Sequence, residues 1–418
     1  MSVLSKTRGV MGDAVRWASG MRRGSWWSEL LSPAPRAARF YVHTWLDWVS
    51  GRARGSDVPT PRPHPLVLLE ATLDELLLAT FKIGRPPRHD DAYWRIIEEA
   101  TVTAEVFEAH GFHLDPMSFW GDPEPFGPPV LRRRRLGARS YEHLSWASGF
   151  EPHPGVPGAD RWRSYTANAT THAYVLRHDE PAPWLLCLPG TGMGFSRADF
   201  RTFPPEWLHD QLGLNVVIPV APLHGPRRRQ ALYGLGFPTD DLVDTVHGIS
   251  QAVWDTRRML GWIHSQSDTP IGMTGISLGG YLTAAVANLE DDLACVIAGV
   301  PPVDFPALFE AHTPKSVRGT PLYDALNSVA GRLFHVVSPL VLDPKPGRDR
   351  RFIYAGTADR LINPHRQALR LWNHWEQPRI NWYAGSHLGF MWSRPVREFI
   401  GDALIDTGLV VDTHLEAA

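Results

Sequence analysis

From about residue 140 onward, the hydrophobic positions follow two patterns that alternate along the chain. Short, continuously apolar runs such as PWLLCLPG, LNVVIPVAP and ACVIAGVPP are typical of strands buried on both faces. Between them lie segments with apolar residues at helical spacing, such as DLVDTVHGISQAVWDTRRMLGWIHS. This alternation predicts an α/β fold with a mostly parallel central sheet and helices on both of its faces. Two earlier segments, YEHLSWASGF and THAYVLRH, are predicted to add antiparallel strands.

The same patterns locate the later elements. Further strands are predicted at 270–277, 294–302, 350–359 and 379–387. Helices are predicted at 199–213, 241–265, 278–291, 321–337, 364–377 and 394–408. In a sheet of this kind, the ligand crevice lies at the carboxyl ends of the parallel strands.

The first third of the chain has a helical pattern instead. LEATLDELLLATF and DDAYWRIIEEATVTAEVFEAHGF place apolar residues at helical spacing, and proline-rich stretches flank them. We therefore expect a helical, tryptophan-rich N-terminal extension or cap over residues 1–135 and an α/β domain over residues 136–418. The run Arg132 to Arg135 is interpreted as part of a solvated linker. A nucleic-acid partner is not expected, because the run is isolated and the net charge is −2.

The N-terminal arm is rich in tryptophan and arginine. Of the 17 tryptophans in the chain, the first fifty residues contain Trp17, Trp26, Trp27, Trp45 and Trp48. Such an arm either packs on the main domain or makes a peripheral membrane contact in the headgroup zone. Pro33 and Pro35 interrupt it and favour packing.

The remaining composition gives little sign of special chemistry. The two cysteines, Cys187 and Cys295, lie in apolar runs, so a disulfide framework is not expected. No apolar run is long enough to span a membrane, and the N-terminus lacks the apolar core of a secretory signal. We expect a cytoplasmic protein. His110 and His113 are interpreted as a helix end rather than a metal site.

One motif points to nucleophilic catalysis. Gly275-Ile276-Ser277-Leu278-Gly279 fits G-x-S-x-G and lies between a predicted strand and a predicted helix. Such a turn presents Ser277 as a nucleophile, and the Leu278 amide at the helix start can face a developing oxyanion. The alternative is a plain turn in which Ser277 caps the helix.

A serine nucleophile needs a histidine base and an acid, here expected in the order Ser, Asp, His. His387 lies at the very end of the last predicted strand, where a glycine-flanked loop begins. The other downstream histidines lie in a predicted helix (His365, His374) or in the tail (His414). For the acid, Asp359 is preferred because its loop leads into the helix before the His387 strand, and Asp304 is the rival.

Two earlier loops complete the expected site. LPGTGMGF, residues 188–195, is flexible enough to bring a second oxyanion donor close to a substrate carbonyl. The Thr191 amide is the first choice for that donor, and Gly192 is the second choice or a lining residue. In APLHGPRRR, His224 is expected to line the substrate site, and Arg227 is a candidate anchor for an anionic group.

Together, GISLGG, AGTADRLINP and AGSHLGF resemble the α/β-hydrolase superfamily over about residues 140–418. LPGTGMGFSRADF and PVAPLHGPRRR are similar to a narrower branch, the eighteenth group of α/β-hydrolase-domain-containing proteins. The superfamily resemblance implies hydrolysis of esters, thioesters or amides through an acyl-enzyme, without a cofactor or metal. The loop before Thr191 reads Leu-Pro-Gly instead of the commoner His-Gly, which leaves the second oxyanion donor open.

These observations predict a serine hydrolase that cleaves the carboxylic ester of a small-molecule or lipid acyl substrate. An amidase, peptidase or thioesterase with the same triad is the first alternative. A hydrolase fold that only binds a ligand is the second. The segment from Phe305 to Thr320 is a candidate lid.

Overall fold

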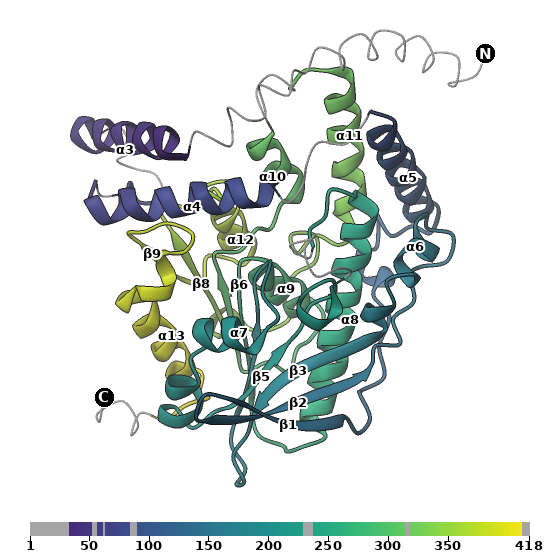
Figure 1. The fold of residues 1–418 in the computed structure, drawn as a ribbon, viewed down its shortest axis with the longest axis vertical. Coiled ribbons are helices and arrows are strands. Elements are labelled where there is room, and N and C mark those ends of the chain that lie inside the picture. Colours follow the sequence, from purple (N-terminus) through teal and green to yellow (C-terminus); the bar gives the residue numbers. More distant parts are fainter. Residues whose placement is uncertain are drawn as a thin grey trace.

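The computed structural model describes residues 33–51, 57–61, 63–83, 90–228, 237–313 and 318–411. Within these residues one nine-stranded sheet runs through the molecule in the order β1-β2-β3-β5-β4-β6-β7-β8-β9 (Figure 1). The strands are β1 (Val130–Leu136), β2 (Arg139–Ala147), β3 (Thr170–Leu176), β4 (Trp184–Leu188), β5 (Asn215–Pro219), β6 (Ile271–Ile276), β7 (Cys295–Gly299), β8 (Arg351–Gly356) and β9 (Arg379–Tyr383).

The sheet is parallel from β5 through β9 and antiparallel from β1 through β3. β3 joins the two parts by pairing antiparallel with β5. Strands β4 to β8 are buried along their whole length, as their continuously apolar sequences require. The predicted fold class is confirmed.

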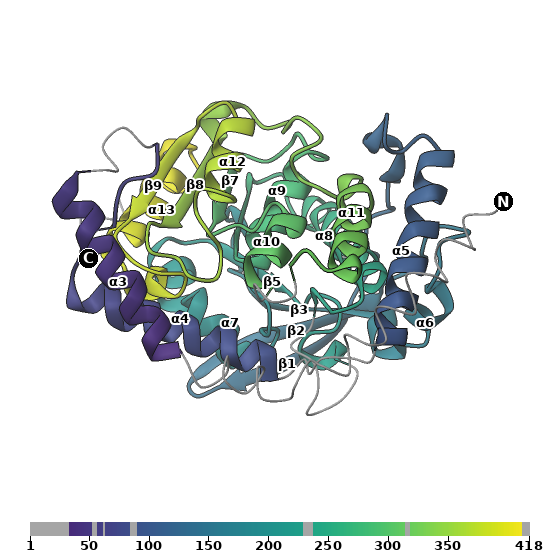
Figure 2. The ribbon, with the colours of Figure 1, turned by 90° about the horizontal axis from the view of Figure 1, so that it is seen from above.

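Helices cover both faces of the sheet, as Figures 1 and 2 show. They are α3 (Pro33–Ser50), α4 (Pro65–Ile83), α5 (Asp90–Ala109), α6 (Ala159–Arg163), α7 (Ser196–Thr202), α8 (Leu242–His264), α9 (Leu278–Ala287), α10 (Phe305–His312), α11 (Pro321–His335), α12 (Ala368–His374) and α13 (Arg394–Asp406). Successive side chains of a strand point to opposite faces, so Leu186 packs in the core beneath α8 and α9. Leu185 packs in a second core beneath α7 and α13.

Two segments differ from their predicted structure. The helix predicted at 199–213 is divided, because α7 ends at Thr202 and a separate turn of π-helix covers Glu206–Gln211. Pro204 and Pro205 lie at the break, where they supply no N–H to a continuous helix. The arginine run interpreted as a linker forms β1, an exposed edge strand paired with β2. Charged side chains suit such an edge because they oppose pairing with another chain.

The N-terminal helices lie in two separate places. α3 and α4 pack on each other near the carboxyl ends of β8 and β9, whereas α5 packs against α11 and α8 on the other side of the molecule (Figures 1 and 2). The expected boundary at residue 135 falls inside β1. Residues 1–135 therefore include the first strand of the sheet.

The structure describes the tryptophan-rich arm from Pro33 onward, as helix α3. Trp17, Trp26 and Trp27 lie outside the described residues. α3 buries Ala37 and Thr44 against the rest of the chain, while Trp45 and Trp48 stay about half exposed. Membrane contact of the arm stays a prediction. In the part of the chain that the structure describes, no helix is long and apolar enough to cross a membrane.

Candidate active site

Ser277 occupies a sharp turn between β6 and α9. Its backbone has φ 53° and ψ −120°, a conformation that a residue with a side chain rarely adopts. Its N–H donates to the Gly299 carbonyl (2.9 Å), and its carbonyl accepts from Tyr281 N–H (3.0 Å). The Ser277 hydroxyl accepts no capping hydrogen bond from the helix N–H groups. The strained turn favours the nucleophile elbow over a plain helix cap.

The glycines of the motif are required by close backbone packing. A Cβ on Gly279 would lie 1.8 Å from the Leu188 carbonyl oxygen at the end of β4. A Cβ on Gly275 would lie 2.2 Å from the Gly279 carbonyl oxygen. Side chains at these two positions would therefore collide with the backbone of the neighbouring strand and helix. Since α9 begins at Leu278, the Leu278 N–H is one of the first amides of the helix, which have no intrahelical acceptor.

His387 and Asp359 are joined by a hydrogen bond. His387 Nδ1 lies 2.7 Å from Asp359 Oδ2, and both side chains are buried. Asp359 Oδ1 accepts the N–H groups of Leu361 (2.9 Å) and Ile362 (2.7 Å), which fixes the carboxylate. Because a carboxylate only accepts, Nδ1 carries the proton and Nε2 is left as the basic nitrogen when the ring is neutral.

Asp304, the rival acid, has another role. Its Oδ1 caps helix α10 by accepting Ala307 N–H (2.9 Å), and its Oδ2 pairs with Arg370. The structure therefore brings Asp359, and not Asp304, to His387. Among the described residues, no hydrogen bond joins the Ser277 hydroxyl to the His387 ring; in ligand-free enzymes such bonds are often long and shorten only with substrate bound.

The surroundings of His387 favour its protonated form. Burial alone would lower the pKa of His387, but the hydrogen-bonded Asp359 carboxylate and the charge of Asp74 outweigh it and raise the pKa above its ordinary value. A base with a raised pKa takes up a proton more readily during a reaction. This suits proton transfer from a serine hydroxyl.

The glycine-rich loop after β4 lies beside Ser277. A Cβ on Gly190 would be 3.4 Å from the Ser277 Cβ, so the loop that carries Thr191 and Gly192 adjoins the turn. The Thr191 hydroxyl donates to the Phe237 carbonyl (3.4 Å), and Gly192 is exposed with φ 84°. This position agrees with a second oxyanion donor in the loop, and the choice between the two amides stays a prediction.

A buried carboxyl that the sequence analysis missed holds the same loop. Asp199 accepts Gly194 N–H (3.0 Å), and the Gly194 carbonyl accepts from the Tyr174 hydroxyl (3.0 Å). Burial raises the pKa of Asp199 to about 7. The loop is thus tied to both β3 and α7.

His224 and Arg227 are both buried. The His224 ring bonds to the Pro222 carbonyl (2.8 Å) and lies edge-on to Phe237. Arg227 has no exposed surface, donates to the carbonyls of Val220 and Asn168, and pairs with Asp255 at 2.9 Å. Arg227 therefore stabilises the fold rather than presenting a cation to an anionic substrate group. This corrects the expectation that Arg227 anchors an anionic group, and the lining role of His224 stays a prediction.

Two further carboxylates beside His387 come from the N-terminal extension. Glu70 and Asp74 of α4 are buried and accept hydrogen bonds from the loop that contains His387. They are four residues apart in LEATLDELLLATF, so they lie on one face of the helix. The sequence does contain one sign of this contact, because two acidic residues stand on an otherwise apolar face of the helix. Carboxylates are almost never buried without partners, so such a pair indicates hydrogen-bond donors on the surface that the helix covers.

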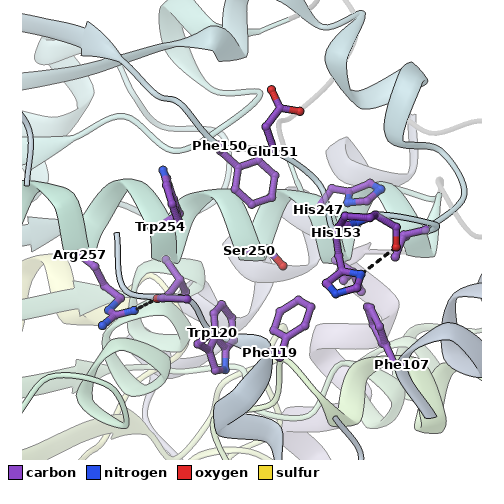
Figure 3. A pocket seen from close by; sticks show the side chains of 15 residues that line it. Phe107, Phe119, Trp120, Phe150, Glu151, His153, His247, Ser250, Trp254 and Arg257 are labelled. Atoms are coloured by element: carbon purple, nitrogen blue, oxygen red, sulfur yellow. Dashed lines mark hydrogen bonds between the residues drawn. The ribbon is translucent and has the colours of Figure 1, made fainter. Parts of the chain in front are cut away.

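A separate cavity of about 200 Å³ opens between α8 and the segments at Phe119–Gly121 and Phe150–Val156. Figure 3 shows that aromatic side chains, among them Phe107, Phe119 and Phe150, line it around the Ser250 hydroxyl. None of the three predicted triad residues lines this cavity. Within the described residues, no group of three or more His, Cys, Asp or Glu side chains is placed to hold a metal ion.

Two solved structures are similar to this chain. Acetyl xylan esterase 1 from a Thermoanaerobacterium species is 14% identical, with a TM-score of 0.46 over 69% of this chain and 96% of that chain. Acetyl xylan esterase from a Paenibacillus species is 15% identical, with a TM-score of 0.47 over 67% of this chain and 89% of that chain. With its mostly parallel sheet and the serine turn after β6, the chain has the α/β-hydrolase fold.

Sequence comparison identifies relatives that cover nearly the whole chain. No family model matches it. Two proteins of Mycobacterium tuberculosis, the uncharacterized protein MT2702 of strain CDC 1551 and the uncharacterized protein Rv2627c of strain H37Rv, are each 41% identical over 384 residues. The alignment covers 92% of this chain and 92% of each relative, and so includes most of the N-terminal extension. The chain therefore belongs to the same family as these two mycobacterial proteins.

Proposed function

We propose that the protein is a serine hydrolase that cleaves a carboxylic ester through an acyl-enzyme intermediate. The observation that carries this proposal is the 2.7 Å hydrogen bond between His387 and Asp359, at the same edge of the sheet as the strained Ser277 turn. The three residues follow β6, β8 and β9 in the order typical of the fold. Similarity to the narrower eighteenth group stays a prediction.

In the proposed reaction, His387 Nε2 removes the Ser277 hydroxyl proton as the oxygen attacks the acyl carbon. Asp359 holds the ring in the required tautomer and stabilises the imidazolium that forms. The N–H groups of Leu278 and Thr191 bind the oxyanion, and the imidazolium then protonates the departing alcohol. Water, deprotonated by His387, then attacks the acyl carbon. The bond from the acyl carbon to Ser277 Oγ breaks, the His387 imidazolium returns the proton to Oγ, and the carboxylic acid leaves. No cofactor takes part in these steps.

Labelling with a fluorophosphonate probe tests the nucleophile without knowledge of the substrate. We expect the wild-type protein to be labelled at Ser277 and the Ser277→Ala variant to stay unlabelled. Equal thermal melting points of the two proteins would serve as the folding control. Labelling of Ser277→Ala at the wild-type rate would contradict the proposal.

A series of p-nitrophenyl esters of increasing acyl length tests the reaction itself. If the three residues act as a unit, Ser277→Ala should lower kcat by about a million-fold. Asp359→Asn should lower it by about ten-thousand-fold, because the histidine loses its oriented partner. A labelled protein with negligible rates across the whole series would direct the search to thioesters and amides.

A further inference from the structure

We propose that Asp74, on helix α4 of the N-terminal extension, is a positioning residue that holds the His387 and Asp359 loops together. This inference rests on the proposed function, because it assigns a partner to the base of the proposed triad. α4 (Pro65–Ile83) precedes His387 by about 300 residues in the chain, but the two are in direct contact.

One carboxylate oxygen of Asp74 joins the two loops. Asp74 Oδ2 accepts the main-chain N–H of His387 (2.9 Å) and that of Arg360 (3.0 Å), the residue after Asp359. The other oxygen accepts the Ser386 hydroxyl (3.0 Å) and Leu388 N–H (3.3 Å). A carboxylate has about four acceptor positions, and here all four meet donors from these loops.

Glu70, one turn earlier on α4, secures the same loop from the adjacent position. It accepts Ser386 N–H (2.9 Å) and the Trp392 ring N–H (2.8 Å). A Cβ on Gly385 or on Gly389 would lie 2.7 Å from Glu70 Oε2. The glycines of AGSHLGF thus allow the helix carboxylates to approach the backbone closely, which a loop facing solvent would not require.

The titratable and charged groups around His387 come from four elements. Asp74 and Asp359 are both close enough to favour its imidazolium form, and Asp74 itself is fully buried. The Arg360 guanidinium binds Glu75 (3.0 Å), and only the Arg360 main-chain N–H binds Asp74. The titratable and charged groups that face this cluster are Arg36 on α3, Glu70, Asp74 and Glu75 on α4, Asp359 and Arg360 after β8, and Tyr383 and His387 at the end of β9.

This arrangement predicts a definite pH behaviour. Burial, followed by the charge of Asp359, raises the pKa of Asp74 to about 6, so Asp74 is ionised at neutral pH and gains a proton below about pH 6. A protonated carboxyl carries an O–H donor and no longer accepts all four hydrogen bonds. Ionised Asp74 also stabilises the His387 imidazolium. Removing its charge should therefore lower the pKa of His387 and weaken proton uptake in the transition state.

The test is the pH dependence of fluorophosphonate labelling, measured on the full-length protein. In Asp74→Asn the amide oxygen can replace Oδ2 and keep the bonds from His387 N–H and Arg360 N–H. The variant removes the charge and the acceptor for Leu388 N–H at Oδ1. We expect the midpoint of its acidic limb to move to lower pH and its plateau rate to fall. Asp74→Ala removes all four bonds and should lower the plateau by roughly a hundred-fold through misplacement of His387.

Glu75→Gln is the matched control. Glu75 is equally buried on the same helix, but its carboxylate binds the Arg360 side chain and not the His387 loop. This variant should leave the midpoint unchanged. An unmoved midpoint in Asp74→Asn, or a wild-type plateau in Asp74→Ala, would overturn the proposal.

Nuclear magnetic resonance separates this inference from the proposed function. The His387 ring signals, assigned by their absence in His387→Ala, can be titrated in the wild type and in Asp74→Asn. We expect the lower pKa in the variant whether or not Ser277 reacts with the probe. Failure of labelling in the wild type would contradict only the proposed function, while equal His387 titrations would contradict only the role of Asp74.

Discussion

Arg227 has a side chain that is suited to binding an anion, but all of its contacts stabilise the fold. Its guanidinium donates to the carbonyls of Val220 and Asn168 and pairs with Asp255, which also accepts from the Ser148 hydroxyl (2.6 Å). These contacts join the loop after β5 to α8 and to the segment before β3. Burial lowers the pKa of Arg227, while the Asp255 charge opposes this effect.

At the scale of this residue, we predict that Arg227→Ala lowers the free energy of unfolding by about 3–5 kcal/mol, because it leaves Asp255 buried without its partner. The double variant Arg227→Met, Asp255→Leu should be less destabilised than the sum of the single variants. Urea unfolding measures both effects. Arg228→Met is the control, since the neighbouring Arg228 is exposed and should change stability by less than about 0.5 kcal/mol. Comparable losses in both single arginine variants would contradict a role specific to Arg227.

At the scale of elements, the strands and the loops after them follow from local sequence patterns. The alternation of apolar runs and helical segments predicted β4 to β9, and the order of loops selected Asp359 and His387, which are hydrogen-bonded in the structure. The interpretation of Arg132 to Arg135 was wrong, because a strand at the edge of a sheet needs no apolar face. The catalytic roles of Ser277, Asp359 and His387 stay predictions.

The contribution of α4 was not predictable from such patterns. Its helix was expected, but the partners of Asp74 and Glu70 lie more than 280 residues later in the chain. Hydrophobic periodicity shows that a helix has an apolar face, and it does not identify the surface that the face covers. A pair of acidic residues on that face indicates that hydrogen-bond donors lie opposite it, but not which part of the chain supplies them.

The tight packing of the turn between β6 and α9 predicts how substitutions of its glycines change stability. Gly279→Ala should strongly lower the thermal stability or prevent folding, because the new Cβ would meet the backbone carbonyl of Leu188, which β4 holds in place. Gly331→Ala is the matched control. This glycine is exposed on α11 with open space at the Cβ position, so alanine should raise the free energy of unfolding by roughly 0.5–1 kcal/mol. Thermal melting of the two variants would move in opposite directions, and similar melting points would refute the packing argument.

At the scale of the whole molecule, the N-terminal helices are bound to the α/β domain at separate points. α4 is bound through Asp74 and Glu70. α5 is bound by ion pairs of Glu99 with Arg161 (2.9 Å) and of Glu108 with Arg332 (2.7 Å). Opening of α4 would exchange the hydrogen bonds between its carboxylates and the Ser386 and His387 amides for bonds to water. A hydrogen bond to a charged group contributes about 1.5–3 kcal/mol net, so local opening of α4 should be rare.

We therefore predict that α4 opens only when the whole molecule unfolds. Amides open to exchange with free energies that range from near zero in loosely held segments to the global value in the core. Native-state hydrogen exchange should thus give the 65–83 segment an opening free energy equal to that of β6 (Ile271–Ile276). α3 is the internal comparison: most of its side chains are exposed, and it should open at a lower free energy. Asp74→Ala should lower the value for α4 toward that of α3 while β6 stays more protected. If wild-type α4 already exchanges as fast as α3, the extension is a loosely held cap, and it would not hold the His387 loop in place.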